Sequence, residues 1–297
     1  MSAIARPGRR IAVIVPCFND GATIEDAVAS ARVQDVPVEI LVVDDGSDDP
    51  ATLEVLERLE ADGVGVLRRA NGGPSAARMA GVHASDAPYV LPLDADDVLA
   101  AGALRLLRDA LDDDPSAAAA WGRVRHFGAA NFVQGSAPGL DPWQITYYNH
   151  LPLTALYRRR AILDVGGWEF PGGYEDWDLW MSLAERGWTG VGVPVIACHY
   201  RVAAGRRLSR SSRRHGERYA KLRERHADLF AERRRHRRDS PAPPLLKAAL
   251  PAIHALPLSQ SHKRLLCSAV THLATSPDWQ AMVGRTRAYR VRRGAPA

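Results

Sequence analysis

A chain of 297 residues with 46% hydrophobic residues, 25% charged residues and a net charge of +5 is typical of a globular protein with a large core. No uninterrupted apolar run reaches the about 18 residues of a membrane-spanning helix, and the run at 11–15 is too short for a secretion signal. The three cysteines, Cys17, Cys198 and Cys267, are odd in number and lack metal-ligand spacing, so we expect a reduced, cytoplasmic protein without a disulfide framework.

The first hundred residues alternate short apolar runs with amphipathic stretches, which predicts alternating strands and helices. The predicted strands lie at 11–15, 38–43, 64–67 and 89–93, and the predicted helices at 23–33, about 53–59 and 74–84. Such alternation is typical of a parallel sheet with right-handed crossovers. Ligands bind beyond the carboxyl ends of the strands in such sheets, so the polar residues after these strands are expected to converge on one cleft.

Beyond residue 111 the pattern is looser. We expect a strand at 117–127, a loop at 128–142, an extended segment at 151–157, a helix at 175–187 and a closing strand at 190–200. The charged residues 209–238 are predicted to form a long helix, and prolines mark a boundary at 241–244. The aromatic residues of this half are expected in the core rather than stacked on sugar rings: Trp143, Tyr147, Tyr148, Trp168, Trp177 and Trp180.

Charge divides the chain into an acidic body and a basic C-terminal region. Residues 1–200 contain 16 Lys+Arg and 28 Asp+Glu, residues 201–240 contain 15 and 5, and residues 241–297 contain 8 and 1. We therefore predict an α/β domain over 1–204 and a basic, largely helical extension over 205–297. The extension is either a solvated charged helix or a contact with anionic membrane, and nucleic-acid binding is disfavoured because no readout motif is present.

The run Asp94-Ala95-Asp96-Asp97 follows the fourth predicted strand. Hard cations such as Mg²⁺ and Mn²⁺ prefer carboxylate oxygens and often share their coordination shell with substrate phosphates. The same acids would also serve as the N-cap of a helix over 98–111. The sequence by itself leaves the metal site and the helix cap equally open.

Two further turns follow strands at the same predicted edge. The run Asp44-Asp45-Gly46-Ser47 ends the second strand, where a carboxylate either contacts a base or ribose or simply caps an Asp-Gly turn. The run Asn71-Gly72-Gly73-Pro74, with Arg78 behind it, opens a helix whose N-terminus favours anions, although Asn-Gly-Gly is also a common loop.

A fourth cluster, Gly172-Gly173-Tyr174-Glu175-Asp176, places acids at the start of the helix predicted at 175–187. Sugar transfer to a hydroxyl needs a base that takes the acceptor proton, and a carboxylate serves this purpose. Carboxylates in a first helical turn are also stabilised by the helix dipole, so simple capping is the alternative.

Taken together, these motifs resemble the inverting family-two glycosyltransferases over about residues 10–201. The resemblance rests on six motifs in order: Val15-Pro16-Cys17-Phe18-Asn19, Val42-Val43-Asp44-Asp45-Gly46-Ser47, Asn71-Gly72-Gly73 with Ala77-Arg78, Leu93-Asp94-Ala95-Asp96-Asp97, Gly166-Gly167-Trp168, and Glu175-Asp176. The chain departs from the family's frequent residues at Phe18, Met79 and Ala203.

The resemblance implies the GT-A fold, a Rossmann-like, mostly parallel sheet flanked by helices, with a nucleotide-diphosphate sugar donor and Mn²⁺ or Mg²⁺. It implies that Asp176 is the catalytic base and that Asp96 and His199 contact the metal. The donor-binding residues that it implies are Pro16, Phe18, Asn19, Asp45, Gly73, Arg78, Asp94 and Glu175.

The expected reaction moves a sugar, from a UDP-sugar by preference, to a hydroxyl of a glycan, lipid-linked or small-molecule acceptor in envelope or polysaccharide synthesis. Two alternatives stay open, a sugar-phosphate nucleotidyltransferase and a non-catalytic binding protein. The first usually needs a basic glycine-rich loop after the first strand, and residues 16–22 contain no Lys or Arg. The expected location is the cytoplasm, with peripheral contact at the inner face of the membrane.

Overall fold

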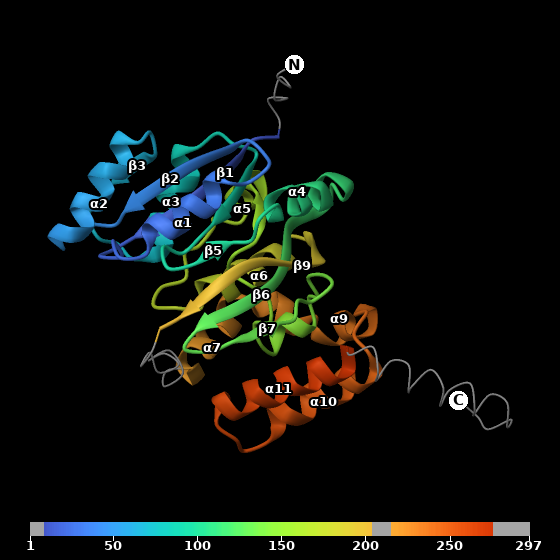
Figure 1. The fold of residues 1–297 in the computed structure, drawn as a ribbon. Coiled ribbons are helices and arrows are strands. Elements are labelled where there is room, and N and C mark those ends of the chain that lie inside the picture. The colour runs from blue at the N-terminus through green and yellow to red at the C-terminus, as the bar shows by residue number, and fades with distance from the viewer. Residues whose placement is uncertain (1–8, 204–214, 276–297) are drawn as a thin grey trace, which may run out of the picture. The chain divides into compact units, whose positions relative to one another are not determined.

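The computed structural model describes residues 9–203 and 215–275, which form two compact units (Figure 1). The first unit comprises residues 1–140 and 151–209, and the second comprises residues 141–150 and 210–297. The predicted boundary at 204/205 and the predicted helix start at 209 lie outside the described residues.

One mixed sheet forms the centre of the first unit (Figure 1). Its spatial order is β3 (Gly65–Arg68), β2 (Val38–Asp44), β1 (Ile11–Cys17), β4 (Tyr89–Pro92), β8 (Leu156–Arg158), β6 (Ala117–Gly128), β9 (Thr189–Val202) and β5 (Val98–Leu99), with β7 (Phe132–Gln134) paired to β6. The pairs β3–β2, β2–β1, β1–β4 and β6–β9 are parallel. Strand β8 is antiparallel to both β4 and β6 and so joins the two parallel parts.

Helices flank this sheet, which confirms the predicted α/β class. They are α1 (Ile24–Arg32), α2 (Pro50–Ala61), α3 (Pro74–Ala84), α4 (Ala103–Asp113), α5 (Arg159–Asp164) and α6 (Glu175–Glu185). Local chemistry sets several starts: Asp49 caps α2 by accepting from Thr52 N at 2.9 Å, and prolines open α2 and α3. All seven residues of β1 are buried, as expected for a strand covered on both faces.

Three predictions of secondary structure are wrong. The loop predicted at 128–142 contains β7, and the helix predicted at 98–111 begins only at Ala103 because residues 98–99 pair with β9. In the described part of 209–238, the long helix is divided into α7 (His215–Arg225), α8 (Ala227–Ala231) and α9 (Arg233–Asp239). The breaks fall at His226 and Glu232, and Leu222, His226 and Leu229 are buried on the side of these helices that packs into the unit.

The second unit combines α7–α9 with α10 (Pro244–Ala255), α11 (Gln260–Thr275) and the segment 141–150, which holds the short 3₁₀ helix η2 (Gln144–Thr146). Polar contacts fix this segment to the C-terminal helices. Asp141 accepts from Ser240 Oγ at 2.6 Å, and Arg233 donates to Thr146 Oγ1 at 2.7 Å while it lies over the Tyr147 ring at 3.9 Å.

The six aromatic residues expected in the core are all buried. Trp143, Tyr147 and Tyr148 pack in the second unit, and Trp168, Trp177 and Trp180 in the first. Within the described residues, no helix has the length and apolar character needed to cross a membrane.

Gly81→Ala tests the close contact between α3 and β1. An added Cβ would lie 2.4 Å from Ile14 Cγ2, so we expect a loss of about 1–3 kcal/mol in the free energy of unfolding, measured by urea and thermal unfolding. Gly216→Ala on α7 is the control, because no atom lies within 4 Å of its added Cβ. Equal stability of the two variants would contradict the packing described.

Candidate active site

Arg78 connects two of the predicted site motifs. Its buried guanidinium donates from Nη2 to Asp94 Oδ1 at 2.8 Å and from Nη1 to Glu175 Oε1 at 3.2 Å. Burial acts to lower the pKa of Arg78, but the charges and hydrogen bonds of Asp94 and Glu175 hold that pKa above its ordinary value. The end of β4 and the start of α6 therefore meet at one cation, because a buried charge requires partners of opposite sign.

Asp45 fixes the loop that precedes α3. Its buried carboxylate accepts from Gly73 N at 2.7 Å and from Gly72 N at 3.1 Å, and it pairs with Arg69. Gly73 has φ +86°, a conformation that favours glycine, and precedes the first residue of α3. The predicted base contact and the predicted phosphate-binding turn are thus joined by hydrogen bonds.

Asn19 likewise fixes a loop by hydrogen bonds, in this case the loop at residues 47–49. Its side-chain oxygen accepts from the backbone N–H groups of Asp48 and Asp49, both at 3.0 Å, and its own N–H donates to Ser47 Oγ at 3.1 Å. Its φ of +58° is left-handed, a conformation in which Asn is enriched. Next to it, the side chain of Phe18 is 46% exposed, while Pro16 is buried in β1.

Asp97 is a buried strand-edge carboxylate and does not cap a helix. Its Oδ1 accepts from Arg201 N at 3.0 Å, and Arg201 Nε donates to the Asp96 carbonyl at 3.0 Å. Burial, followed by the charge of Asp94, raises the pKa of Asp97 to about 8. The helix-cap alternative is wrong for Asp97, since β5 follows it and Gly102 precedes α4.

The carboxylates and the imidazole at this edge are donor types that divalent cations accept. The charges of Asp94 and Asp96 both raise the pKa of Asp97, so these carboxylates lie close together. In β9, His199 pairs with Val98, two residues after Asp96. No cluster of three or more His, Cys, Asp or Glu residues capable of holding a metal occurs in the described chain, and Mg²⁺ typically needs only one or two carboxylates besides phosphate and water.

Asp176 lies in the first turn of α6, after a glycine-rich approach. Gly172, Gly173 and Tyr174 all have positive φ, and Trp177 N donates to Asp176 Oδ1 at 2.8 Å. Burial, and then the charge of Asp176, raises the pKa of Tyr157 well above its ordinary value. The Tyr157 ring packs against Trp168 and Trp180, at centroid distances of 5.6 and 5.2 Å, so aromatic rings line the region next to Asp176.

The structure thus forms two separate groups of predicted site residues. One joins Asp45 to Gly73, and the other joins Arg78 to both Asp94 and Glu175. The structure also reveals two arginines that the sequence analysis missed. Arg69 directly follows β3 and pairs with Asp45. Arg201 on β9 donates to the Asp96 carbonyl, to the Asp97 carboxylate and, at 2.7 Å, to Asp26. The available signal was their position at the end of a predicted strand; the sequence separation from the acids they contact, 24 residues for Arg69 and more than 100 for Arg201, concealed the pairing.

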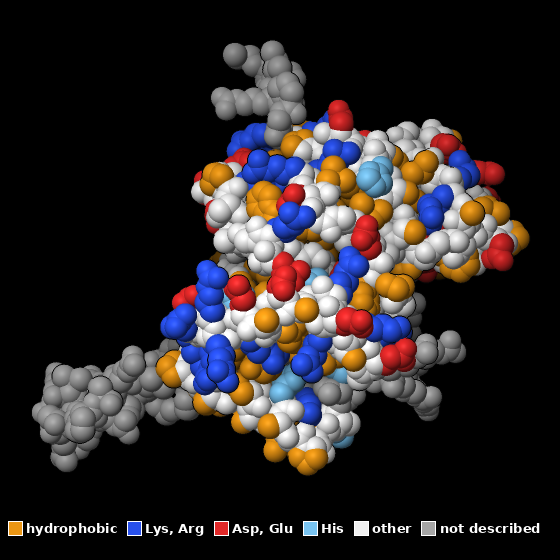
Figure 2. Space-filling model, turned by 180° about the vertical axis from the view of Figure 1, so that it is seen from behind, with side chains coloured by type: hydrophobic (Ala, Val, Ile, Leu, Met, Phe, Trp, Pro, Cys, Tyr) orange, Lys and Arg blue, Asp and Glu red, His pale blue; other side chains and the backbone are white. Residues whose placement is uncertain are grey.

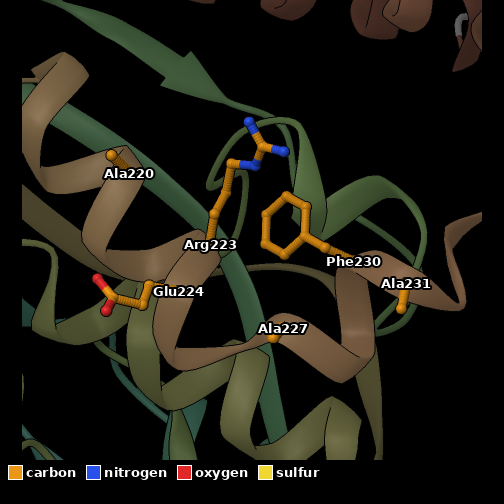
Figure 3. A pocket seen from close by; sticks show the side chains of 6 residues that line it. All are labelled: Ala220, Arg223, Glu224, Ala227, Phe230 and Ala231. Atoms are coloured by element: carbon orange, nitrogen blue, oxygen red, sulfur yellow. The ribbon is translucent and has the colours of Figure 1, made fainter.

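A hollow of about 460 Å³ lies elsewhere, in the second unit between α7 and α8 (Figure 3). Figure 3 shows the Arg223 side chain beside the Phe230 ring, and its guanidinium carbon is 5.6 Å from the ring centroid. None of the predicted site residues lines this hollow.

Residues 12–162, half of the chain, match the family described as Glycosyl transferase family 2. The chain belongs to this family. The match confirms the predicted resemblance.

Two curated relatives of this family-2 chain make polysaccharides according to their names. Succinoglycan biosynthesis protein ExoU of Rhizobium meliloti is 32% identical over 205 residues, which are 60% of this chain and 57% of that protein. Poly-beta-1,6-N-acetyl-D-glucosamine synthase of Staphylococcus aureus is 24% identical over 209 residues, which are 63% and 49% of the two chains. The chain spans about half the length of these relatives.

Solved structures confirm the predicted GT-A fold. S. aureus TarS 1-349 in complex with UDP-GlcNAc matches with a TM-score of 0.56 at 21% identity, over 90% of this chain and 73% of that chain. Mannosyltransferase PcManGT from Pyrobaculum calidifontis in complex with GDP-Man and Mn²⁺ matches with a TM-score of 0.53 at 20% identity, over 98% and 84%.

Arg78→Ala tests the central ion pairs. Removing the cation leaves Asp94 and Glu175 facing each other, so we expect a loss of about 3–5 kcal/mol in the free energy of unfolding. Arg78→Lys should recover only part of the lost stability, because one ammonium group cannot donate to both carboxylates as the two guanidinium nitrogens do. Arg58→Ala is the control: Arg58 forms two exposed ion pairs, and we expect a change below about 1 kcal/mol. A loss as small for Arg78→Ala as for the control would contradict the assignment.

Asp97→Asn tests the raised pKa by thermal unfolding in chelator-treated buffer. The folded-state pKa of about 8 exceeds the unfolded value of about 4, so the folded protein binds this proton more tightly. Wild-type stability, relative to the variant, should be greatest below about pH 4 and fall by up to about 1.4 kcal/mol per pH unit until about pH 8. A stability difference that does not vary with pH would show that Asp97 titrates normally.

Proposed function

We propose that this chain is an inverting, metal-assisted glycosyltransferase that moves a sugar from a nucleotide-diphosphate donor, by preference a UDP-sugar, to an acceptor hydroxyl. The observation that carries the proposal is the Arg78 cluster, which joins the Asp94 motif to the helix start that holds Glu175 and Asp176. Family membership and the fold shared with proteins whose structures were solved with UDP-GlcNAc or GDP-Man support it.

In this proposal the donor binds along the edge formed by the β1, β2 and β4 ends. The exposed Phe18 ring, with Pro16, Asn19 and Asp45, contacts the nucleobase. The N-terminus of α3 at Gly73 faces the donor's negative charge, and Arg78 holds Asp94 and Glu175 in place for the ribose or sugar hydroxyls.

Asp96 and His199 are the proposed contacts of Mn²⁺ or Mg²⁺. When bound, the cation offsets the charge that develops on the leaving diphosphate. The chain's own contribution is to fix the backbone at this point, because Arg201 donates to the Asp96 carbonyl and its N–H donates to Asp97.

Asp176 is the proposed base. Its carboxylate takes the proton of the acceptor hydroxyl while that oxygen forms a bond to the anomeric carbon from the face opposite the diphosphate. The bond between the anomeric carbon and the phosphate oxygen breaks, and its electron pair leaves with the nucleoside diphosphate. A single displacement inverts the anomeric centre, so an α-linked donor gives a β-linked product.

The names of the relatives favour an acceptor in polysaccharide or glycoconjugate synthesis, either a glycan or a lipid-linked sugar. Because residues 201–297 are strongly basic, we include in the proposal peripheral contact with an anionic membrane at the cytoplasmic face. The nucleotidyltransferase alternative lacks its basic loop after β1.

Asp96→Ala and Asp176→Asn separate binding from chemistry. A panel of nucleotide sugars is screened for Mn²⁺-dependent hydrolysis and for thermal stabilisation of the protein. We expect Asp96→Ala to lower the affinity for the donor, obtained from thermal stabilisation, about tenfold or more. We expect Asp176→Asn to keep that affinity while the rate of sugar transfer falls about 10²–10⁴-fold.

Glu54→Gln, an exposed acid on α2, serves as the control and should behave as wild type. The proposed function fails if both site variants retain full transfer, or if no nucleotide sugar is hydrolysed or stabilises the protein.

A further inference from the structure

Helix α10, the first helix of the hairpin formed by α10 and α11, is apolar on its exposed side as well as on its buried side. In α10, Leu246 and Leu250 face the core of the second unit, while the exposed positions 248, 252 and 255 are all alanine. A surface helix of a water-soluble domain normally carries polar or charged residues on that outer face. This hairpin therefore presents a surface suited to a medium less polar than water.

The second helix and the connecting turn extend this surface. Leu265 on α11 is 68% exposed, and four more leucines are exposed over the same hairpin: Leu256, Leu258, Leu266 and Leu273. Figure 2 shows hydrophobic side chains gathered at the lower end of the view, the end where Figure 1 shows α10 and α11. Exposed apolar side chains gathered on one element often mark an interaction site.

The charges in and next to the hairpin are predominantly positive. Residues 241–275 contain no Asp or Glu. The preceding helix α9 has the sequence RRRHRRD, and its exposed Arg237 donates to the Lys247 carbonyl at 2.9 Å, so α9 lies directly against α10. An apolar face flanked by arginines is the pattern of a helix that lies in the plane of an anionic membrane surface.

We propose that the α10–α11 hairpin anchors the enzyme in one leaflet of an anionic bilayer, with its exposed leucines among the acyl chains and the exposed arginines of α9 at the headgroup phosphates. This deepens the membrane contact within the proposed function by naming the surface that inserts. A second copy of the chain fits this surface less well than a membrane does. Its α9 arginines would approach the α9 arginines of the first copy, and neither hairpin contains an acid that could pair with them. The anchor lies in the interface, since neither helix spans a bilayer.

The test uses the full chain and co-sedimentation with vesicles of equimolar phosphatidylglycerol and phosphatidylcholine. The variant Leu258→Ser/Leu265→Ser/Leu266→Ser should lower vesicle affinity at least about tenfold. The control Val33→Ser/Leu53→Ser/Leu163→Ser removes three exposed apolar side chains from the first unit and should bind as wild type. Pure phosphatidylcholine vesicles should bind wild type weakly.

Insertion is measured separately with Leu265→Cys carrying an environment-sensitive fluorophore. The three native cysteines are buried, so the label reports on position 265. We expect a blue shift and brighter emission with anionic vesicles, persisting in part at high salt.

Three results would overturn the anchor: hairpin variants that bind vesicles as wild type does, a label that stays in water, or a dimer in solution that the hairpin variants dissociate. Hydrolysis of nucleotide sugars without vesicles tests the proposed function, so failure of one idea is distinguishable from failure of the other.

Discussion

The buried guanidinium of Arg78 lies between Asp94 at the end of β4 and Glu175 at the start of α6. An unpaired charge at that depth would cost several kcal/mol, so the fold must bring both carboxylates to it. Asp176, adjacent to Glu175, is placed at the strand edge as a consequence. The position of the proposed base relative to the donor-binding motifs therefore depends on Arg78. This arginine would affect transfer through positioning, without contact with the reacting atoms.

The remaining polar residues of this edge follow the same principle. Asp45 accepts from the Gly72 and Gly73 N–H groups, Asn19 from those of Asp48 and Asp49, and Asp97 from that of Arg201. Each side chain satisfies backbone donors of a neighbouring loop or strand and so holds that segment before any ligand arrives. Substitution of these residues will consequently disturb the shape of the edge as well as any direct contact with a donor.

The second unit contributes a different kind of constraint. Its segment 141–150 is separated in sequence from α7–α11, yet Asp141 and Thr146 bind it to Ser240 and Arg233. If the hairpin lies in a membrane surface, an enzyme acting on a lipid-linked acceptor searches two dimensions, and the effective concentration of acceptor rises without any new contact at the site. The proposed anchor would then assist the proposed reaction by keeping the enzyme at the surface that holds its acceptor.

The sequence by itself determined the alternation of strands and helices up to Ala84, the family, and the set of acids that follow the strands, because periodicity and turn residues act over a few neighbours. It left Asp97 ambiguous between cap and strand edge, since the answer depends on β9, about a hundred residues away. The breaks at His226 and Glu232, the pairing of β7 and the partners of Arg78 were likewise decided only by tertiary structure. Burial and the demand of buried polar groups for partners are long-range conditions, which local sequence patterns do not encode.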